Sequence, residues 1–162
     1  MISDRVNETR VIRTALPTDA QAITDLHFRA RSTYYPDGVP DDGTDWPAAW
    51  QGVIVRPHAE VLCLIEQDHI VAVASFRTPD EAPPETVKLF QFHVDPHHWR
   101  EGLGTALHRA CVDRWRADAR QTAVLEVHVD NERAQAFYTR QGWVAAPPDG
   151  GHHLPMTLPL TT

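Results

Sequence analysis

The chain has very little lysine and no long apolar run. Lys88 is its only lysine, and the 15 basic residues are outnumbered by 22 acidic ones, which leaves a formal net charge of −7. This balance argues against a nucleic-acid-binding protein, because such proteins carry a basic surface. No apolar stretch approaches the roughly 18 residues that span a bilayer, so we also expect no membrane segment.

Cysteine is scarce as well. Cys63 and Cys111 both lie in apolar runs and lack the spacing of a metal or redox motif, so we expect buried, reduced thiols. Residues 1–5, Met-Ile-Ser-Asp-Arg, do not begin a signal peptide. Together these features predict a cytoplasmic protein.

What is present is enough for one ordinary domain. Of 162 residues, 42% are hydrophobic and 23% are charged, which is close to the globular average and excludes a wholly disordered chain. A chain of this length buries roughly 70% of its unfolded surface. Because there is no repeat and no low-complexity linker, we expect a single domain over residues 1–162.

Hydrophobic periodicity predicts an α+β fold with helices on the faces of a sheet. Residues 67–69 form a short polar connection typical of a hairpin, and residues 32–57, rich in Pro, Gly and Asp, are typical of a binding segment. The predicted strands are 10–16, 61–66, 70–76, 87–95, 123–129 and 154–160. The predicted helices are 17–31, a short piece at 47–53, 102–117 and 131–141.

The sharpest local feature is the turn at residues 95–105, between a predicted strand and a predicted helix. Gly102 and Gly104 let a ligand approach the backbone closely, and the N–H groups at the helix start favour an anion such as pyrophosphate. The turn lacks the Gly-Lys-Ser/Thr of a Walker loop and the spacing of a dinucleotide fingerprint. Alone, it is more typical of an ordinary turn than of a ligand site.

A second motif follows at residues 131–143, Asn-x-x-Ala-x-x-Phe-Tyr-x-x-x-Gly-Trp. With the earlier Arg-x-Gly-Leu-Gly-x-x-Leu of residues 100–107, in this order and separation, the sequence resembles the GCN5-related N-acetyltransferase (GNAT) superfamily. The two motifs cover roughly residues 87–144, and the element order extends the likeness less specifically over the rest of the chain.

The resemblance implies a mixed, mostly antiparallel central sheet, flanked by helices and splayed between its fourth and fifth strands. It implies acetyl-CoA as co-substrate and transfer of acetyl to a primary amine by direct attack, with Tyr138 as the general acid. Asn131 also fits a plain helix cap. The implied cofactor-binding residues are Phe92, His93, Val94, Trp99, Arg100, Glu101, Gly102, Leu103, Gly104, Thr105, Asn131, Phe137 and Tyr138.

Two residues depart from the family pattern. Trp99 stands where Gln or Arg is usual, and Lys88 stands where several members have a catalytic Glu. We therefore expect Glu126 to be the base that deprotonates the amine. Simple pairing of Glu126 with an arginine on the sheet is an equal alternative, and His93 and His128 are further candidates for proton relay.

The acceptor is the least determined part. Residues 34–50 and 147–153 shape the acceptor site in this family, and the first segment combines aspartates with aromatic residues, which suits a cationic amine but also a solvated loop. We expect Tyr34, Tyr35 and Glu126 to bind a small-molecule amine. A peptide N-terminus or lysine, and a catalytically silent acyl-CoA-binding module, are the alternatives. The histidine pairs 97–98 and 152–153 lack the partners of a metal site, so no metal is expected. A homodimer is expected only because the resemblance to the family implies one.

Overall fold

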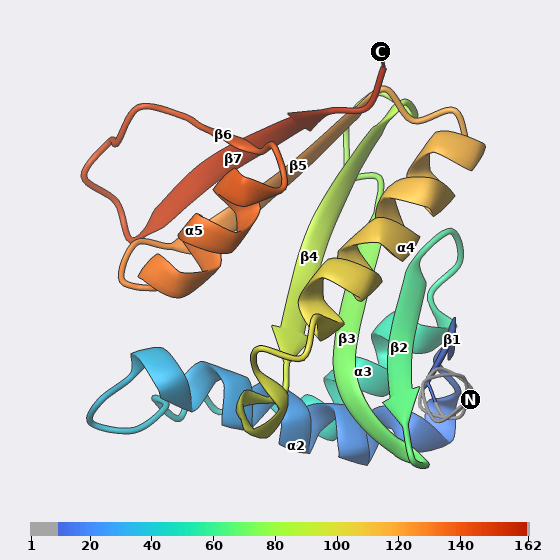
Figure 1. Ribbon diagram of the computed structural model, residues 1–162, viewed down its shortest axis with the longest axis vertical. Coiled ribbons are helices and arrows are strands. Elements are labelled where there is room, and N and C mark those ends of the chain that lie inside the picture. Colours follow the sequence, from blue (N-terminus) through green and yellow to red (C-terminus); the bar gives the residue numbers. More distant parts are fainter. Residues whose placement is uncertain (1–9, 162) are drawn as a thin grey trace.

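The computed structural model describes residues 10–161, which build a seven-stranded sheet in the order β1-β2-β3-β4-β5-β7-β6 (Figure 1). Neighbouring strands are antiparallel except for β4 and β5, which run parallel. The predicted mostly antiparallel sheet is therefore confirmed. The strands are β1 (Arg10–Thr14), β2 (Glu60–Glu66), β3 (His69–Arg77), β4 (Thr86–Val94), β5 (Thr122–His128), β6 (Val144–Ala145) and β7 (His153–Pro159). The sequence did not predict β6, because two residues show no periodicity.

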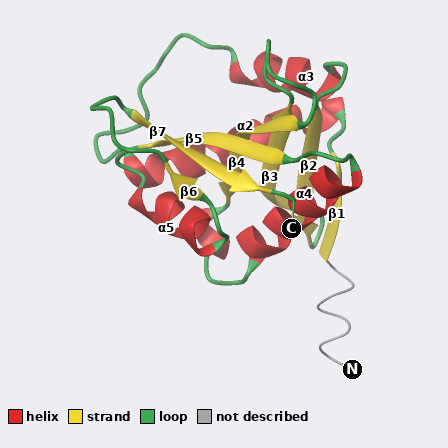
Figure 2. Ribbon diagram, turned by 90° about the horizontal axis from the view of Figure 1, so that it is seen from above, coloured by secondary structure: helices red, strands yellow, loops and turns green. Residues whose placement is uncertain are grey.

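Helices cover both faces of the sheet, as Figure 2 shows from above. Helices α2 (Ala20–Arg31) and α3 (Trp46–Val55) lie on one face, and α4 (Leu103–Ala117) and α5 (Glu132–Arg140) lie on the other. The predicted helix at 17–31 begins with a 3-10 turn, Pro17–Asp19, and two further 3-10 turns are Ser32–Tyr34 and Pro96–His98. None of the helices among the described residues is long and apolar enough to cross a membrane.

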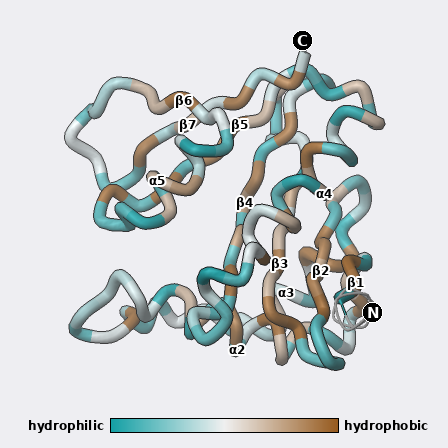
Figure 3. Tube along the Cα trace, in the orientation of Figure 1, coloured by the Kyte–Doolittle hydropathy of each residue, from teal (hydrophilic) through white to brown (hydrophobic). Residues whose placement is uncertain are grey.

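Each face of the sheet has its own hydrophobic core, because side chains alternate along the strands. On β2, Leu62 and Leu64 face α4, whereas Val61 and Cys63 face α2 and α3. Figure 3 shows that β2 and β3 contain long hydrophobic stretches, coloured brown. The second cysteine, Cys111, is buried on α4. Both cysteines are free thiols, as predicted, and burial raises the pKa of Cys63 to about 12.

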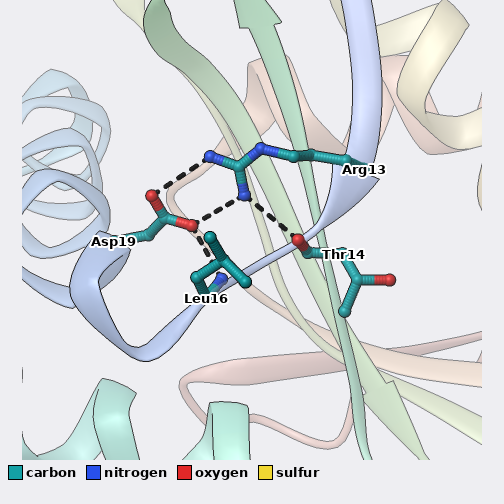
Figure 4. Close-up of polar contacts among 4 residues, drawn as sticks. All are labelled: Arg13, Thr14, Leu16 and Asp19. Carbon is teal, nitrogen blue, oxygen red and sulfur yellow. Dashed lines mark hydrogen bonds and ion pairs between the residues drawn. The ribbon is translucent and has the colours of Figure 1, made fainter.

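The link between β1 and α2 is held by one ion pair. Arg13 Nη1 donates to Asp19 Oδ2 at 2.8 Å, and the backbone N–H of Leu16 donates to the same oxygen at 2.7 Å (Figure 4). The hydrogen bond from Arg13 lowers the pKa of Asp19. This carboxylate therefore fixes the direction in which α2 leaves the sheet.

The feature that positions the site is a fork between β4 and β5. These strands pair only over Thr86–Leu89 and Thr122–Leu125, and they diverge beyond that point (Figure 1). The register with β3 shifts at the same place, since Ser75 pairs with Gln91 but Phe76 pairs with Leu89. Phe90 is thus the extra residue of a β-bulge, which bends the strand. The predicted splay between the fourth and fifth strands is confirmed.

Candidate functional site

Two clefts meet at the fork. Cleft 1, of about 450 Å³, lies between β4, α4 and α5, and cleft 2, of about 360 Å³, lies between β4, β5 and the C-terminal end of α2. Backbone groups of β4 beyond Leu89 that face β5 have no strand partner there, so they are available to a ligand. Six residues line both clefts: Tyr34, Phe92, His93, Asn131, Ala134 and Tyr138.

The floor of cleft 1 is the start of α4. Gly102 adopts φ +77°, a conformation that favours glycine, and no atom lies within 4 Å of the place where its Cβ would be. The first intrahelical bond runs from the N–H of Ala106 to the carbonyl of Gly102 at 3.0 Å. The N–H groups of residues 103–105 therefore have no intrahelical acceptor and face the positive end of the helix dipole.

Gly104 is required for a different reason. A Cβ at this position would lie 3.3 Å from Phe137 Cε1 and 3.5 Å from Val94 Cγ2. The missing side chain lets α5 pack closely against the start of α4. Phe137 in turn stacks on Phe92, with ring centres 5.6 Å apart, so the aromatic wall of cleft 1 depends on this glycine.

Cleft 1 brings together all but one of the predicted cofactor residues. Glu101 does not line it; its carboxylate lies 3.3 Å from His98 Nδ1, and its side chain is partly exposed. Glu101 stays a predicted backbone N–H contact of the turn, because its carboxylate does not line the cleft. Those that do line it are Phe92, His93, Val94, Trp99, Arg100, Gly102, Leu103, Gly104, Thr105, Asn131, Phe137 and Tyr138.

Asn131 begins α5 as its cap. Its Oδ1 accepts a hydrogen bond from the N–H of Ala134 at 3.1 Å, which accounts for the asparagine by helix capping alone. The residue also lines both clefts, so the capping role and contact with a ligand are compatible.

Three arginines concentrate positive charge in cleft 1. Arg133, Arg100 and Arg140 all line it, and none of them has a carboxylate within 4.0 Å among residues 10–161. The guanidinium carbon of Arg133 lies 3.6 Å from the centre of the Trp99 ring. Burial, followed by the charges of Arg100 and Arg140, lowers the pKa of Arg133. This crowding of like charges is relieved by an anion.

Tyr138 occupies the point where the clefts join. It is 7% exposed, and its ring packs against Phe92, Phe137 and Trp143. Burial raises its pKa above the ordinary value, so the phenol keeps its proton throughout the physiological range. The arrangement presents one protonated hydroxyl group at the junction.

Glu126 is the first residue of β5 beyond the last β4 partner. It lines cleft 2, and Oε2 lies 3.9 Å from Lys88 Nζ. The predicted strand alternation places Leu125 and Val127 in the core and Glu126 on the opposite, solvent-accessible face. The alternative of pairing with an arginine does not hold among the described ion pairs, because the partner is Lys88.

Two stacked histidines form the back of cleft 2. His27 and His93 lie 4.4 Å apart between ring centres, and Trp50 Nε1 donates to His27 Nδ1 at 3.2 Å. His93 Nε2 contacts Gln91 Oε1 at 2.7 Å. Burial lowers the pKa of His27 to about 4 and holds that of His93 well below its ordinary value, so both rings are neutral at pH 7. Sequence reasoning missed His27 as a site residue, because its helical spacing is typical of any core position.

Aromatic side chains from two separate segments meet at cleft 2. His128 at the end of β5 lies 5.7 Å from Tyr34 and 5.6 Å from Tyr35 between ring centres. The His152 ring stacks on the His128 ring, and the His153 ring meets it edge-on. No group of three or more His, Cys, Asp or Glu residues in the described part of the chain is arranged to hold a metal ion. Tyr34, Tyr35 and Glu126, the predicted acceptor residues, thus all line cleft 2.

The model of the acetyltransferase (GNAT) family matches residues 20–143, well over half of the chain. The chain belongs to the GNAT family. No curated protein matches the sequence, so the remaining comparison is with solved structures. The matched residues include every residue that lines the two clefts except His153.

Solved GNAT structures share the fold over nearly the whole chain. The PaiA N-acetyltransferase of Thermoplasma acidophilum, solved in complex with coenzyme A, is 14% identical, with a TM-score of 0.76 over 93% of this chain and 98% of that one. The ribosomal-protein-S18-alanine N-acetyltransferase of Escherichia coli is 23% identical, with a TM-score of 0.74 over 94% and 95%. A GNAT acetyltransferase of Staphylococcus aureus Mu50 is 11% identical, with a TM-score of 0.79 over 94% and 99%. The TM-scores show that the chain shares the fold of these proteins.

Proposed function

We propose that this GNAT protein transfers the acetyl group of acetyl-CoA to the primary amine of a small molecule by direct attack. The observation that carries the proposal is the fork itself, where a cationic cleft and a polar cleft meet at Tyr138. Two substrates that enter from opposite faces of the sheet come together there. Positioning of this kind removes much of the entropic barrier of a two-substrate reaction.

The residues of cleft 1 fit the coenzyme. The pyrophosphate would rest on the free N–H groups at the start of α4, with Arg100, Arg133 and Arg140 around it. The pantetheine would run along the unpaired edge of β4 from Phe92 to Val94. When bound, acetyl-CoA supplies the thioester and the acceptor supplies the amine that attacks it, whereas the chain positions both and transfers the protons.

Two side chains serve the proton transfers. Glu126 accepts a proton from the incoming ammonium group, directly or through a water, which its half-exposed side chain allows. As the nitrogen attacks, its bond to the acetyl carbon forms and the carbon–sulfur bond breaks. Tyr138, protonated because it is buried, donates its proton to the departing thiolate and regains one from the nitrogen, which loses its second proton as the amide forms. His93 and His27 are neutral and wall the acceptor side, where His93 can accept a hydrogen bond from the amine.

The test is a titration of the protein with acetyl-CoA by calorimetry, followed by an amine panel with detection of released thiol. The expected result is one coenzyme per chain and amine-dependent release of CoA. Binding without release from any amine or peptide would instead support a silent acyl-CoA-binding module. Release with peptides alone would support a peptide N-terminus as the acceptor, so the panel includes both classes.

A further inference from the structure

Cleft 2 contains one strong cation at its rim. Arg31, the last residue of α2, is the one arginine or lysine among the described residues that lines this cleft. Its charge acts on the cleft interior, because it lowers the pKa of His27 and of His93 after the larger effect of burial on each. Arg31 therefore faces the acceptor space.

Arg31 forms no close ion pair among the described residues, although its charge contributes to the lowered pKa of Asp42, after the larger effect of the hydrogen bonds from Thr44. Two residues earlier on the same helix, Arg29 Nη2 lies 3.0 Å from Asp95 Oδ2, which gives Arg29 a structural role. By contrast, no carboxylate of residues 10–161 lies within 4.0 Å of Arg31, and its guanidinium carbon lies 5.4 Å from the ring centre of Tyr35. A guanidinium group presents five N–H donors in a planar fork that suits a carboxylate.

Cleft 2 also contains negative charge. Glu126 lies at the fork, and Asp42 lines the cleft from the loop before α3, where Oδ1 accepts from the N–H of Thr44 at 2.9 Å. The cleft therefore offers an anion near the reacting centre and a cation at its rim. A ligand with charges of both signs matches it, whereas a dication would leave Arg31 opposite a like charge.

The size of the cleft favours a small molecule. Its volume of about 360 Å³ lies within the range of small-ligand sites. The rings of Tyr34 and Tyr35 contact His128, so aromatic side chains occupy part of the wall of this cleft.

We propose that the acceptor in cleft 2 is an amino acid or a close analogue, with its carboxylate on Arg31 and its amine at the fork. This inference rests on the proposed acetyl transfer and specifies its substrate class. The α-carboxylate pairs with the guanidinium fork of Arg31, and the amine lies between Glu126 and Tyr138. Hydrogen bonds to a charged group of this kind typically raise affinity by about tenfold or more.

The experiment compares L-amino acids with their carboxamides as acceptors, in pairs that differ only in the negative charge. The amide's amino group is less basic and is more often neutral, so chemistry alone favours the amide. We expect kcat/KM to favour the acid by about tenfold or more in the wild type. In Arg31→Gln the preference is expected to fall to about twofold or less, and in Arg31→Lys part of it returns. Equal rates for acids and amides in the wild type, or an unchanged preference in Arg31→Gln, would overturn the proposal.

Arg109→Gln is the matched control. Arg109 is exposed on α4 and lines neither cleft. The substitution removes the same charge as Arg31→Gln, so the variant should keep the full preference for the acid. A loss of preference in this variant would mean that net charge, rather than Arg31, selects the acid.

A binding measurement separates this inference from the proposed function. Calorimetric titration of the CoA-bound protein with the same pairs reports acceptor binding without turnover. Tighter binding of acids that is lost in Arg31→Gln supports the inference. If no thiol is released in the same experiments, the proposed acetyl transfer is rejected and the acceptor assignment is kept. Equal binding of acids and amides, binding of neither, or a preference for C-terminally amidated peptides would overturn the inference while leaving acetyl transfer intact.

Discussion

Lys88 Nζ and Glu126 Oε2 lie 3.9 Å apart across the last paired rung of β4 and β5, at the point where the strands separate. A lysine on β4 thus faces a carboxylate on β5. Of the two residues, Glu126 alone lines cleft 2, so the carboxylate at the fork comes from β5.

The first prediction concerns this pair. Glu126→Gln should lower kcat by about a hundredfold, within the usual range for a general base, with a small change in KM for acetyl-CoA. Lys88→Gln removes the partner but keeps the carboxylate, so its loss should be much smaller. The measurement is steady-state kinetics with thiol detection. Equal losses in the two variants would show that the ion pair matters for structure and that Glu126 is not the base.

The second prediction concerns Tyr138. Tyr138→Phe keeps the packed ring but removes the hydroxyl, so kcat should fall by about tenfold or more while the melting temperature changes little. Because burial raises the pKa of the phenol, the wild-type rate should show no loss from ionisation of this group up to about pH 10. A variant with the wild-type kcat across that pH range would remove Tyr138 from the mechanism.

The third prediction concerns the turn before α4. Gly102→Ala and Gly102→Glu share the strained φ of +77°, and both have room for the new side chain, so each should lose about 1 kcal/mol of stability. Only the glutamate adds a negative charge where the phosphates bind. We expect it to weaken CoA binding by at least about tenfold beyond the alanine variant in calorimetry. Equal CoA affinities in the two variants would place the pyrophosphate elsewhere.

Much of this site could be predicted from short-range patterns. The glycines, Asn131 and Tyr138 follow from local motifs, and the strand period correctly places Glu126 on the face opposite Leu125 and Val127. These features depend on neighbours in the sequence, where backbone geometry determines the outcome.

Long-range contacts could not be predicted in this way. The stacking of His27 on His93 joins α2 to β4, and the bulge at Phe90 arises from the register with β3. Glu101 occupies the variable position of the Arg-x-Gly motif, and its carboxylate lies beside His98 and not in the cleft. Such contacts depend on tertiary packing, for which a single sequence carries no periodic signal.

The fourth prediction concerns Trp99, the residue that departs from the family pattern. The indole face holds the Arg133 guanidinium at 3.6 Å in cleft 1, so Trp99→Ala should weaken CoA binding by about threefold to tenfold, and Trp99→Phe by less. If the tryptophan acts through Arg133, the effects of Trp99→Ala and Arg133→Gln should not add in a double-mutant cycle. Fully additive losses in calorimetry would mean that Trp99 contacts the coenzyme independently.

The last prediction concerns acid stability. His108 is buried on α4, where its Nε2 accepts from Trp143 Nε1 at 2.9 Å, and burial lowers its pKa to about 4 from 6.5. As the pH falls from 6.5 toward 4, the unfolded chain takes up a proton that the folded protein does not, so the free energy of unfolding decreases. Between pH 7.5 and 5 this one histidine accounts for about 2 kcal/mol. His27, with the same depressed pKa, adds a similar amount.

His108→Gln keeps an acceptor for the Trp143 indole but cannot titrate, so its stability should depend less on pH. Urea unfolding at pH 7.5 and pH 5 should show a loss that is smaller than in the wild type by about 2 kcal/mol. His69→Gln is the control, because His69 is exposed at the start of β3 and should leave the wild-type pH dependence unchanged. If His108→Gln and the wild type lose the same free energy, His108 is protonated in the folded protein, and the acid sensitivity arises from other groups.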